Sequence, residues 1–356
     1  MKAVVWNGPF DIALKDVPVP TPRKEEVLVR TKVVGICGSD IEIYNGRFKQ
    51  SVPPMIIGHE GGGIVHAVGG GVRSVKPGDR VIVECVLSCG QCEYCKQGRF
   101  GLCDNGGVLG MVGAQGEYAE YFVAPEKNCH RLPDEISWPE AGLIDTLAGP
   151  EYAMSRITAA SQGAVTTPRT WAIFGPGPAG LFFCALAKLQ GARKVFLVGT
   201  REYRLEYGPQ FGADVLINTG RDDAVDVIRS GTEGKGVDVV IEAAGSDAAL
   251  TQCIRSVKKG GFVFIYGVFG MGPVPLDIQP IQFFELIVHG TANVLYPPAI
   301  EHIKTRAIRV DTLVTHRLAL EEVPEAFSQE LIEKKLEHYA HYMKGVVMPD
   351  LKEEKR

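Results

Sequence analysis

The stretch TWAIFGPGPAGLFFCALAKLQ, residues 170–190, decides the fold. A strand-like apolar run ends at Phe174, a glycine-rich turn follows, and the next residues have the apolar pattern of a helix. Glycines at this spacing allow a tight turn, a close approach of the backbone to a pyrophosphate, and close packing of the helix on the strand. The stretch therefore predicts a dinucleotide-binding turn, whose cofactor-binding residues are Gly175, Gly177, Pro178 and Gly180.

Strand-like and helix-like segments alternate beyond this stretch. The runs KVFLV (194–198), VDVVIEAA (237–244) and GGFVFIYG (260–267) read as strands, and REYRLEYGPQF (201–211) and DAALTQCIRSV (247–257) read as helices between them. Strands that alternate with helices favour a doubly wound parallel sheet. We predict a Rossmann domain of the α/β class over residues 153–292.

The two flanking parts of the chain have a different texture. Residues 1–152 hold short alternating or β-branched runs, among them Glu26–Val34 and Glu117–Val123, separated by Gly, Pro and Asp. This pattern predicts a mostly β domain. Residues 293–356 return to mixed segments, with a charged, helix-like stretch at 328–335. A length of 356 residues is consistent with about two domains.

Composition and charge exclude several classes of protein. The 38 Lys and Arg against 42 Asp and Glu give a net charge of −4, which excludes a basic nucleic-acid footprint. The apolar run at the amino terminus is too short for a signal-peptide core, and the longest uncharged stretch, Thr170 to Ala187, is interrupted by Gly and Pro. We expect a cytoplasmic protein that does not enter a membrane.

Four cysteines crowd into residues 89–103, within a lobe over residues 85–105. Cys89, Cys92, Cys95 and Cys103 have the spacing C-x2-C-x2-C-x7-C. Four thiolates in a Gly-containing turn can surround one tetrahedral Zn²⁺ and leave no position for a substrate, so the spacing favours structural zinc. A disulfide pair and an iron–sulfur cluster are the alternatives. Among the other cysteines, Cys129, Cys184 and Cys253 read as buried, inert thiols, and Cys85 reads as a core or edge residue.

A second candidate metal site involves Cys37 in GICGSD and His59 in the string G-H-E-x2-G-x5-G-x2-V from Gly58 to Val72. A Cys and a His 22 residues apart are weak evidence alone. Their order before the four-Cys lobe and the glycine turn resembles the zinc-containing medium-chain dehydrogenases, which include alcohol, sorbitol, threonine and glucose dehydrogenases. The resemblance covers nearly the whole chain and is closest to the polyol and glucose branch.

The resemblance implies a GroES-like β-barrel catalytic domain, split around the Rossmann domain, with a catalytic zinc and a nicotinamide in the cleft. Cys37 and His59 match zinc ligands, and Glu60 matches the carboxylate that is a ligand in the polyol branch. Asp145 stands where that branch usually places Glu or Gln. Since Asp145 is one methylene shorter, a bond through water is as plausible as direct ligation.

The resemblance also implies roles for four polar residues. Ser39 matches the hydroxyl that begins the family's proton relay. Glu42 stands where threonine dehydrogenases have His, and with Glu117 and Glu151 it looks like the carboxylates of glucose dehydrogenases. Such groups accept hydrogen bonds from the hydroxyls of a sugar. A solvated or secondary charge is the alternative for Glu42 and Glu151.

Cofactor choice depends on the end of the strand at 194–198. NAD-binding domains place Asp or Glu there, about 20 residues after the glycine turn. This chain has Gly199, then Thr200 and Arg201, with Arg204 one turn further. A carboxylate would repel a 2′-phosphate, whereas Arg offers charge-assisted hydrogen bonds to it. We predict a preference for NADP, with NAD still possible.

The function expected is therefore zinc-dependent hydride transfer between NADP and a sugar, polyol or other secondary alcohol. Two zinc ions per chain, one catalytic and one structural, follow from the two sites. The alternatives are a threonine or secondary-alcohol dehydrogenase, and a non-catalytic protein that binds NADPH or zinc. By resemblance we also expect a homodimer or homotetramer.

Overall fold

The structure, a computed structural model, describes residues 1–161, 169–269, 273–327 and 341–351. The chain divides into two compact units, one of residues 1–148 and 293–356 (unit 1) and one of residues 149–292 (unit 2). The boundary falls within helix α4 (Ile144–Ser161). The helix-like stretch expected at 328–335 lies outside the described residues.

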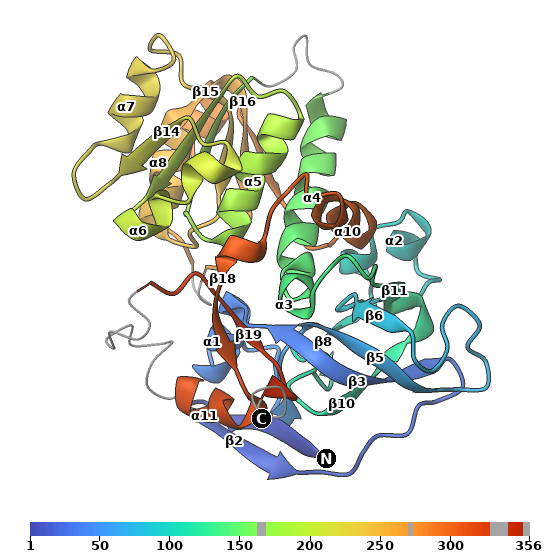
Figure 1. Ribbon diagram of the computed structural model, residues 1–356. Helices are drawn as coiled ribbons and strands as arrows, with labels where there is room; N and C mark the ends of the chain where they lie inside the picture. Colours follow the sequence, from blue (N-terminus) through green and yellow to red (C-terminus); the bar gives the residue numbers. More distant parts are fainter. Residues whose placement is uncertain (162–168, 270–272, 328–340, 352–356) are drawn as a thin grey trace. The chain divides into compact units, whose positions relative to one another are not determined.

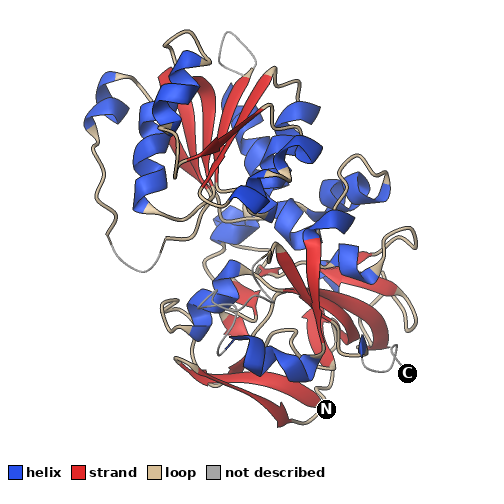
Figure 2. Ribbon diagram, turned by 60° about the vertical axis from the view of Figure 1, so that its left-hand side comes forward, coloured by secondary structure: helices blue, strands red, loops and turns tan. Residues whose placement is uncertain are grey.

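Unit 2 is built on a six-stranded sheet in which every pair of neighbours is parallel. Its order is β14-β13-β12-β15-β16-β17, and helices lie on both of its faces (Figure 2). The strands are β12 (Thr170–Phe174), β13 (Lys194–Gly199), β14 (Val215–Asn218), β15 (Val237–Glu242), β16 (Val257–Ile265) and β17 (Ile287–Gly290). Numbered along the unit, the order is 3-2-1-4-5-6, that of the Rossmann fold. The predicted fold is confirmed.

Continuous apolar runs form these strands because helices cover both faces of the sheet. Residues 171–174 of β12 and 195–198 of β13 are all buried. The helices of unit 2 after α4 are α5 (Pro178–Leu189), α6 (Glu202–Leu205), α7 (Ala224–Ser230), α8 (Asp247–Ser256) and α9 (Gln279–Phe283).

One helix of unit 2 is shorter than its sequence pattern suggests. The run REYRLEYGPQF forms only α6, followed by a separate 3-10 turn at Gly208–Phe211. Pro209 disfavours the α conformation at the residue before it, and Gly208 has the weak helix propensity of glycine, so the α-helix does not continue.

Unit 1 is mostly β, as predicted. Its largest sheet has seven strands, in the order β11-β6-β5-β3-β19-β18, with β10 also paired to β3. These are β3 (Glu26–Gly35), β5 (Glu60–Val68), β6 (Arg80–Val83), β10 (Tyr121–Pro125), β11 (Cys129–Arg131), β18 (Val314–Leu318) and β19 (Lys344–Val347). Figure 1 shows β19, drawn in red, beside blue β3, so the end of the chain completes a sheet begun near its start.

Two small sheets and several helices complete the described part of unit 1. One sheet joins β1 (Lys2–Gly8), β2 (Asp11–Asp16) and β4 (Met55–Ile56), and the other joins β7 (Val86–Leu87), β8 (Gly107–Leu109) and β9 (Gly113–Ala114). The helices include α1 (Gly38–Tyr44), α2 (Glu93–Lys96), α3 (Trp138–Ala141), α10 (Tyr296–Lys304) and α11 (Val323–Glu325), besides the start of α4.

The strand predicted at Glu117–Val123 begins only at Tyr121. Tyr118, before this start, bonds to two different segments, because its backbone N–H donates to the carbonyl of Ile57 and its carbonyl accepts from Val4. The Ala119 N–H donates to the carbonyl of Glu117 (2.7 Å), two residues back, and this tight local turn interrupts the extended strand.

Among the described residues, no helix has the length and apolar character that a membrane crossing requires.

Candidate functional site

Three side chains with metal-ligating atoms meet inside unit 1. Cys37 lies at the N-cap of α1, His59 directly precedes β5, and Glu60 begins it. One ligand atom of each lies within 4.8 Å of the other two, and His59 and Glu60 are buried. A thiolate, an imidazole and a carboxylate that converge in this way suit Zn²⁺.

Asp40 orients the imidazole of His59. Its Oδ1 lies 3.3 Å from His59 Nδ1, and its Oδ2 accepts hydrogen bonds from the Tyr118 hydroxyl (2.8 Å) and the backbone N–H of Cys37 (2.9 Å). Burial disfavours the imidazolium, but the Asp40 carboxylate outweighs burial and raises the pKa of His59 well above its usual value. With Nδ1 facing Asp40, Nε2 remains for a metal.

Sequence reasoning missed Asp40, although it stands three residues after Cys37 in GICGSD. Its complete burial is what distinguishes it from a surface acid, and burial depends on the folded chain.

Ser39 lies beside the same imidazole. Its Oγ is 3.3 Å from His59 Nε2, and the side chain is buried. The hydroxyl is thus placed at the nitrogen available to a metal, a position that suits the proton relay expected of it.

Glu60 is tied to the C-terminal part of the chain. Lys344, on β19, forms an ion pair with Glu60 Oε2, and both side chains are buried. The Thr146 hydroxyl donates to Glu60 Oε1 (3.2 Å) and accepts from Lys344 Nζ (2.9 Å). Burial lowers the pKa of a lysine, but the Glu60 carboxylate outweighs it, so the pKa of Lys344 is raised. Sequence reasoning had no signal for Lys344.

Asp145 lies outside the Cys37, His59 and Glu60 cluster among the described residues. Its Oδ1 accepts a hydrogen bond from the Tyr296 hydroxyl (2.7 Å) and lies 3.4 Å from Cys85 Sγ. Burial, followed by the charge of Glu60, raises the pKa of Asp145 to about 6. The structure therefore assigns Asp145 two protein partners that the sequence did not indicate.

The three carboxylates expected at a substrate have different local surroundings. Glu42, on α1, faces Arg47 at 3.7 Å. Glu117 is fully buried and has no hydrogen-bond partner within the described part of the chain, and burial raises its pKa well above the usual value. Glu151, on α4, belongs to unit 2, where burial raises its pKa to about 7.

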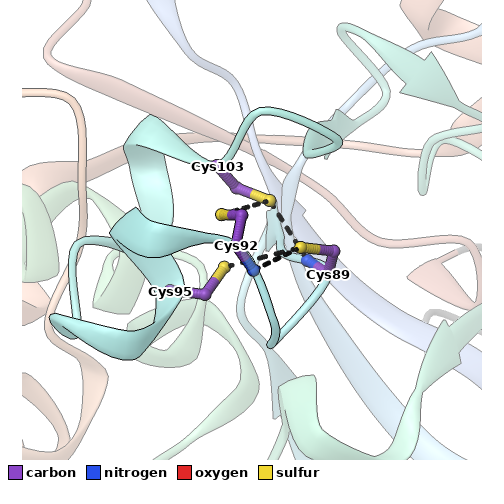
Figure 3. Close-up of side chains that lie close together, drawn as sticks. All are labelled: Cys89, Cys92, Cys95 and Cys103. Atoms are coloured by element: carbon purple, nitrogen blue, oxygen red, sulfur yellow. Dashed lines mark hydrogen bonds between the residues drawn. The ribbon is translucent and has the colours of Figure 1, made fainter.

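The four-Cys lobe brings its thiols together. Figure 3 shows all four sulfurs turned toward one centre, with Cys89 Sγ 3.9 Å from Cys95 Sγ and Cys92 Sγ 3.8 Å from Cys103 Sγ. Sulfurs about 2.3 Å from a central zinc in a tetrahedron lie about 3.8 Å apart, so the spacing fits that metal. Hydrogen bonds from backbone N–H groups, that of Gln91 first, lower the pKa of Cys89 to about 6. None of the described cysteines forms a disulfide.

The glycine turn of unit 2 packs closely against the helix that follows it. Gly175 has a φ of +110°, and a Cβ on Gly180 would lie 1.9 Å from the Gly175 carbonyl oxygen. Gly177 caps α5, and Pro178 opens that helix. The absence of side chains lets the backbone N–H groups at the start of the helix approach an anion.

The residues after β13 carry positive charge. Thr200 is exposed, Arg201 caps α6, and a Cβ on Gly177 would lie 4.0 Å from Nη1 of Arg204. The neighbouring Glu202 binds Arg221 (2.8 Å) and the Asn218 amide (2.6 Å) through its carboxylate.

Family models match both units. The alcohol dehydrogenase GroES-like domain matches residues 23–134, and the zinc-binding dehydrogenase model matches residues 178–305. The predicted GroES-like and Rossmann combination is thereby confirmed.

Known proteins match over almost the full length. The chain is 35% identical to a sorbitol dehydrogenase of Bacillus subtilis (strain 168), with 98% of each chain covered. It is 34% identical to an L-threonine 3-dehydrogenase of Symbiobacterium thermophilum, with 95% of each covered. A crystal structure described as a zinc-binding dehydrogenase from Sinorhizobium meliloti 1021, bound to NADP, superposes with a TM-score of 0.87 at 31% identity, covering 98% of this chain and 99% of that one.

The motifs, the two folds and these matches agree. The chain is an alcohol or polyol dehydrogenase, and it belongs to the zinc-containing medium-chain dehydrogenase family, in its polyol branch.

Proposed function

We propose that the chain transfers a hydride between NADP and a polyol, sugar or other secondary alcohol, with zinc at the Cys37, His59 and Glu60 cluster. The proposal rests on the buried charged partners of two residues of the cluster. His59 is backed by the buried Asp40 carboxylate, and Glu60 is backed by the buried Lys344 ammonium. Such partners orient and charge-balance groups that ligate a metal.

Cys37, His59 and Glu60 are the ligands that we propose for the catalytic zinc, and Asp145 contributes through water, since its Oδ1 already binds the Tyr296 hydroxyl. When bound, zinc supplies Lewis-acid activation of an alcohol oxygen and the nicotinamide supplies the hydride acceptor. Asp40 Oδ1 lies 3.3 Å from His59 Nδ1, where its charge would favour a proton on that nitrogen and leave Nε2 for the metal. Ser39 Oγ would accept the proton that the substrate hydroxyl loses while its own hydroxyl proton passes on toward bulk water, so that the serine ends neutral.

A second zinc is proposed for the four-Cys lobe. Its role is structural, because four thiolates complete a tetrahedral shell and leave no position for a substrate. A reducing, cytoplasmic location is part of this proposal, since thiols remain available to zinc only where they stay reduced.

NADP preference rests on the residues after β13. The site has no acidic side chain at position 199, it has Arg201 and Arg204 close by in sequence, and Glu202 is neutralised by Arg221. An arginine binds a phosphate through charge-assisted hydrogen bonds. The NADP-bound Sinorhizobium relative supports the same choice.

A polyol or sugar is the proposed substrate class, on the strength of the Bacillus sorbitol dehydrogenase relative. The Symbiobacterium threonine dehydrogenase relative supports the alternative. Glu42 argues against threonine, because it stands where that branch has His.

We also propose a homodimer formed through β17. This strand ends the sheet of unit 2, and large apolar side chains on and before it are exposed, namely Ile278, Phe283, Ile287 and Val288. An exposed sheet edge with apolar residues is suited to pairing with a second copy. Light scattering should show a dimer that Ile287→Lys weakens.

The test of the function is a panel of sorbitol, xylitol, glucose, threonine and 2-butanol, each with NADP and NAD, combined with metal analysis. We expect the highest kcat/KM with a polyol or sugar and NADP, and loss of turnover in Cys37→Ala and His59→Ala. An active Cys37→Ala protein, or a clear preference for NAD, would contradict the proposal. Tight cofactor binding without turnover of any alcohol would identify a non-catalytic protein instead.

A further inference from the structure

Gly199 and Pro176, which are 23 positions apart in the sequence, lie close together at the carboxyl end of β13. A Cβ built on Gly199 would lie 2.4 Å from Cγ and 2.5 Å from Cδ of the Pro176 ring. Real side chains do not approach so closely, so any residue larger than glycine at position 199 forces a displacement. The question is which of the two partners can move.

The backbone of β13 at position 199 is held on both sides. The Gly175 N–H donates to the carbonyl of Val198 (2.9 Å), and the Thr219 N–H donates to the carbonyl of Gly199 (2.9 Å). These bonds join β13 to the glycine turn and to the loop after β14. Displacing residue 199 would break ladder bonds of a buried parallel sheet, and each lost bond leaves an unpaired polar group.

Pro176 is held equally firmly. It is buried, and its ring is too rigid to rotate away as a flexible side chain could. It follows Gly175, whose φ of +110° favours glycine and whose Cβ, if present, would lie 2.6 Å from the Ala243 carbonyl oxygen. The backbone of the turn therefore cannot shift to move the Pro176 ring away from position 199.

Position 199 is where NAD-binding Rossmann domains place the carboxylate that accepts a hydrogen bond from the ribose 2′-hydroxyl. We propose that Pro176 is a specificity-determining residue, because its ring occupies the space that a carboxylate side chain at position 199 needs. The chain is thereby restricted to dinucleotides whose 2′-position is recognised by Thr200, Arg201 and Arg204. This inference rests on the NADP preference proposed above.

The consequence is a coupling between two positions. A carboxylate at position 199 alone disrupts the turn, whereas the same carboxylate beside a smaller residue at position 176 can reach the ribose. Effects of substitutions that share one space are not additive, and a double-mutant cycle measures the difference.

The test compares the wild type with Gly199→Asp, Pro176→Ala and the double variant. Calorimetry gives the Kd of two probes, 2′,5′-ADP for the phosphorylated ribose and ADP-ribose for the unmodified one. We expect the wild type and Pro176→Ala to prefer 2′,5′-ADP. We expect Gly199→Asp to bind both probes more weakly and to have a lower Tm. The double variant should bind ADP-ribose at least about tenfold more tightly than Gly199→Asp does. This is the fold-change expected from one charge-assisted hydrogen bond.

The inference fails if Gly199→Asp alone binds ADP-ribose as tightly as the double variant. Gly199→Ala, made in the wild type and in Pro176→Ala, tests the steric contact with a single added Cβ. The substitution should lower the Tm in the wild-type background and leave it unchanged in the Pro176→Ala background, and equal falls in both would overturn the contact. If the wild type binds ADP-ribose as well as 2′,5′-ADP, the NADP preference fails, while the Tm comparison still judges the contact.

Discussion

Lys344 and Glu60 form a buried ion pair although 284 positions separate them in the chain. The pair links β19, near the C-terminus, to the start of β5, where His59 and Cys37 also converge. The geometry of the candidate metal site therefore depends on the C-terminal part of the chain.

Replacing Lys344 should show how much the ion pair with Glu60 contributes to the stability of the fold. Lys344→Met leaves a buried carboxylate without its cation, and we expect the free energy of unfolding to fall by about 3–5 kcal/mol. Denaturant unfolding measures it. Lys344→Arg keeps the charge and serves as the control, and in the Glu60→Gln background Lys344→Met should cost much less. Equal stability of Lys344→Met and the wild type would show that the pair is not formed.

Removing the carboxylate behind His59 should weaken the metal site. In Asp40→Asn the imidazole loses the partner that fixes its tautomer, and we expect zinc affinity at the Cys37 site to fall by about 10- to 100-fold. Competition with a chromogenic chelator measures the affinity. Asp16→Asn, at an exposed carboxylate, is the matched control. An unchanged affinity in Asp40→Asn would exclude the orienting role.

Breaking the four-Cys lobe should remove one metal without touching the other. We expect Cys92→Ala to bind about one zinc per chain where the wild type binds about two, with a lower Tm because the lobe loses its tetrahedral centre. Elemental analysis after gel filtration gives the count. Cys129→Ala, at a thiol outside both clusters, should retain the wild-type content. A full complement of zinc in Cys92→Ala would refute the structural site.

Stability should depend on pH through Glu151. Burial raises its pKa from 4.5 to about 7 in the folded chain, so the folded state binds this proton more tightly than the unfolded one. The stabilisation is complete below about pH 4.5 and is lost as the pH rises through about 7. We expect Tm to fall over this range more steeply in the wild type than in Glu151→Gln. Glu206→Gln, at an exposed carboxylate, should keep the wild-type slope, and identical slopes in all three proteins would contradict the prediction.

The Tyr296 hydroxyl should matter through Asp145. It lies 2.7 Å from Asp145 Oδ1 and 3.0 Å from the Val83 carbonyl oxygen, so one proton serves two acceptors. Tyr296→Phe keeps the ring stacked on His130 but removes the donor, and we expect it to cost about 1–3 kcal/mol in unfolding free energy. In the Asp145→Asn background the same substitution should cost less. An equal cost in both backgrounds would mean that the bond to Asp145 contributes nothing.

Much of unit 2 could be predicted from local pattern. The segments 170–190, 194–198 and 247–257 have periodicities and glycine spacing that specify strand, turn or helix from nearby residues alone, and the structure has those elements. The predicted bounds of a strand were wrong where the conformation of the segment depends on residues distant in the sequence. Residues 117–120 look like part of a strand, but their backbone bonds to three segments distant in the sequence, and no local pattern reveals those bonds.

Some residues of the candidate site could likewise be predicted from a local motif, whereas the partners of others could not. Cys37, His59 and Glu60 could be proposed from a motif, and the structure brings their ligand atoms together. Asp145 was expected at the same metal by resemblance, directly or through water, and the structure adds a hydrogen bond from Tyr296, 151 positions away. The substrate role expected of Glu117 stays a prediction, and its complete burial could be learned only from the folded chain.

By itself, the sequence determined the α/β class, the strand, turn and helix at 170–190, the convergence of four cysteines spaced within fifteen residues, and the family. Only the tertiary structure decided that Lys344 faces Glu60, that Tyr296 holds Asp145, and that the Pro176 ring fills the space above Gly199. The physical reason is the distance along the sequence over which each kind of interaction acts. Backbone conformation and the convergence of closely spaced thiols are set by neighbours in the chain. Buried charge pairs and steric contacts are set by the way in which distant strands and helices pack together.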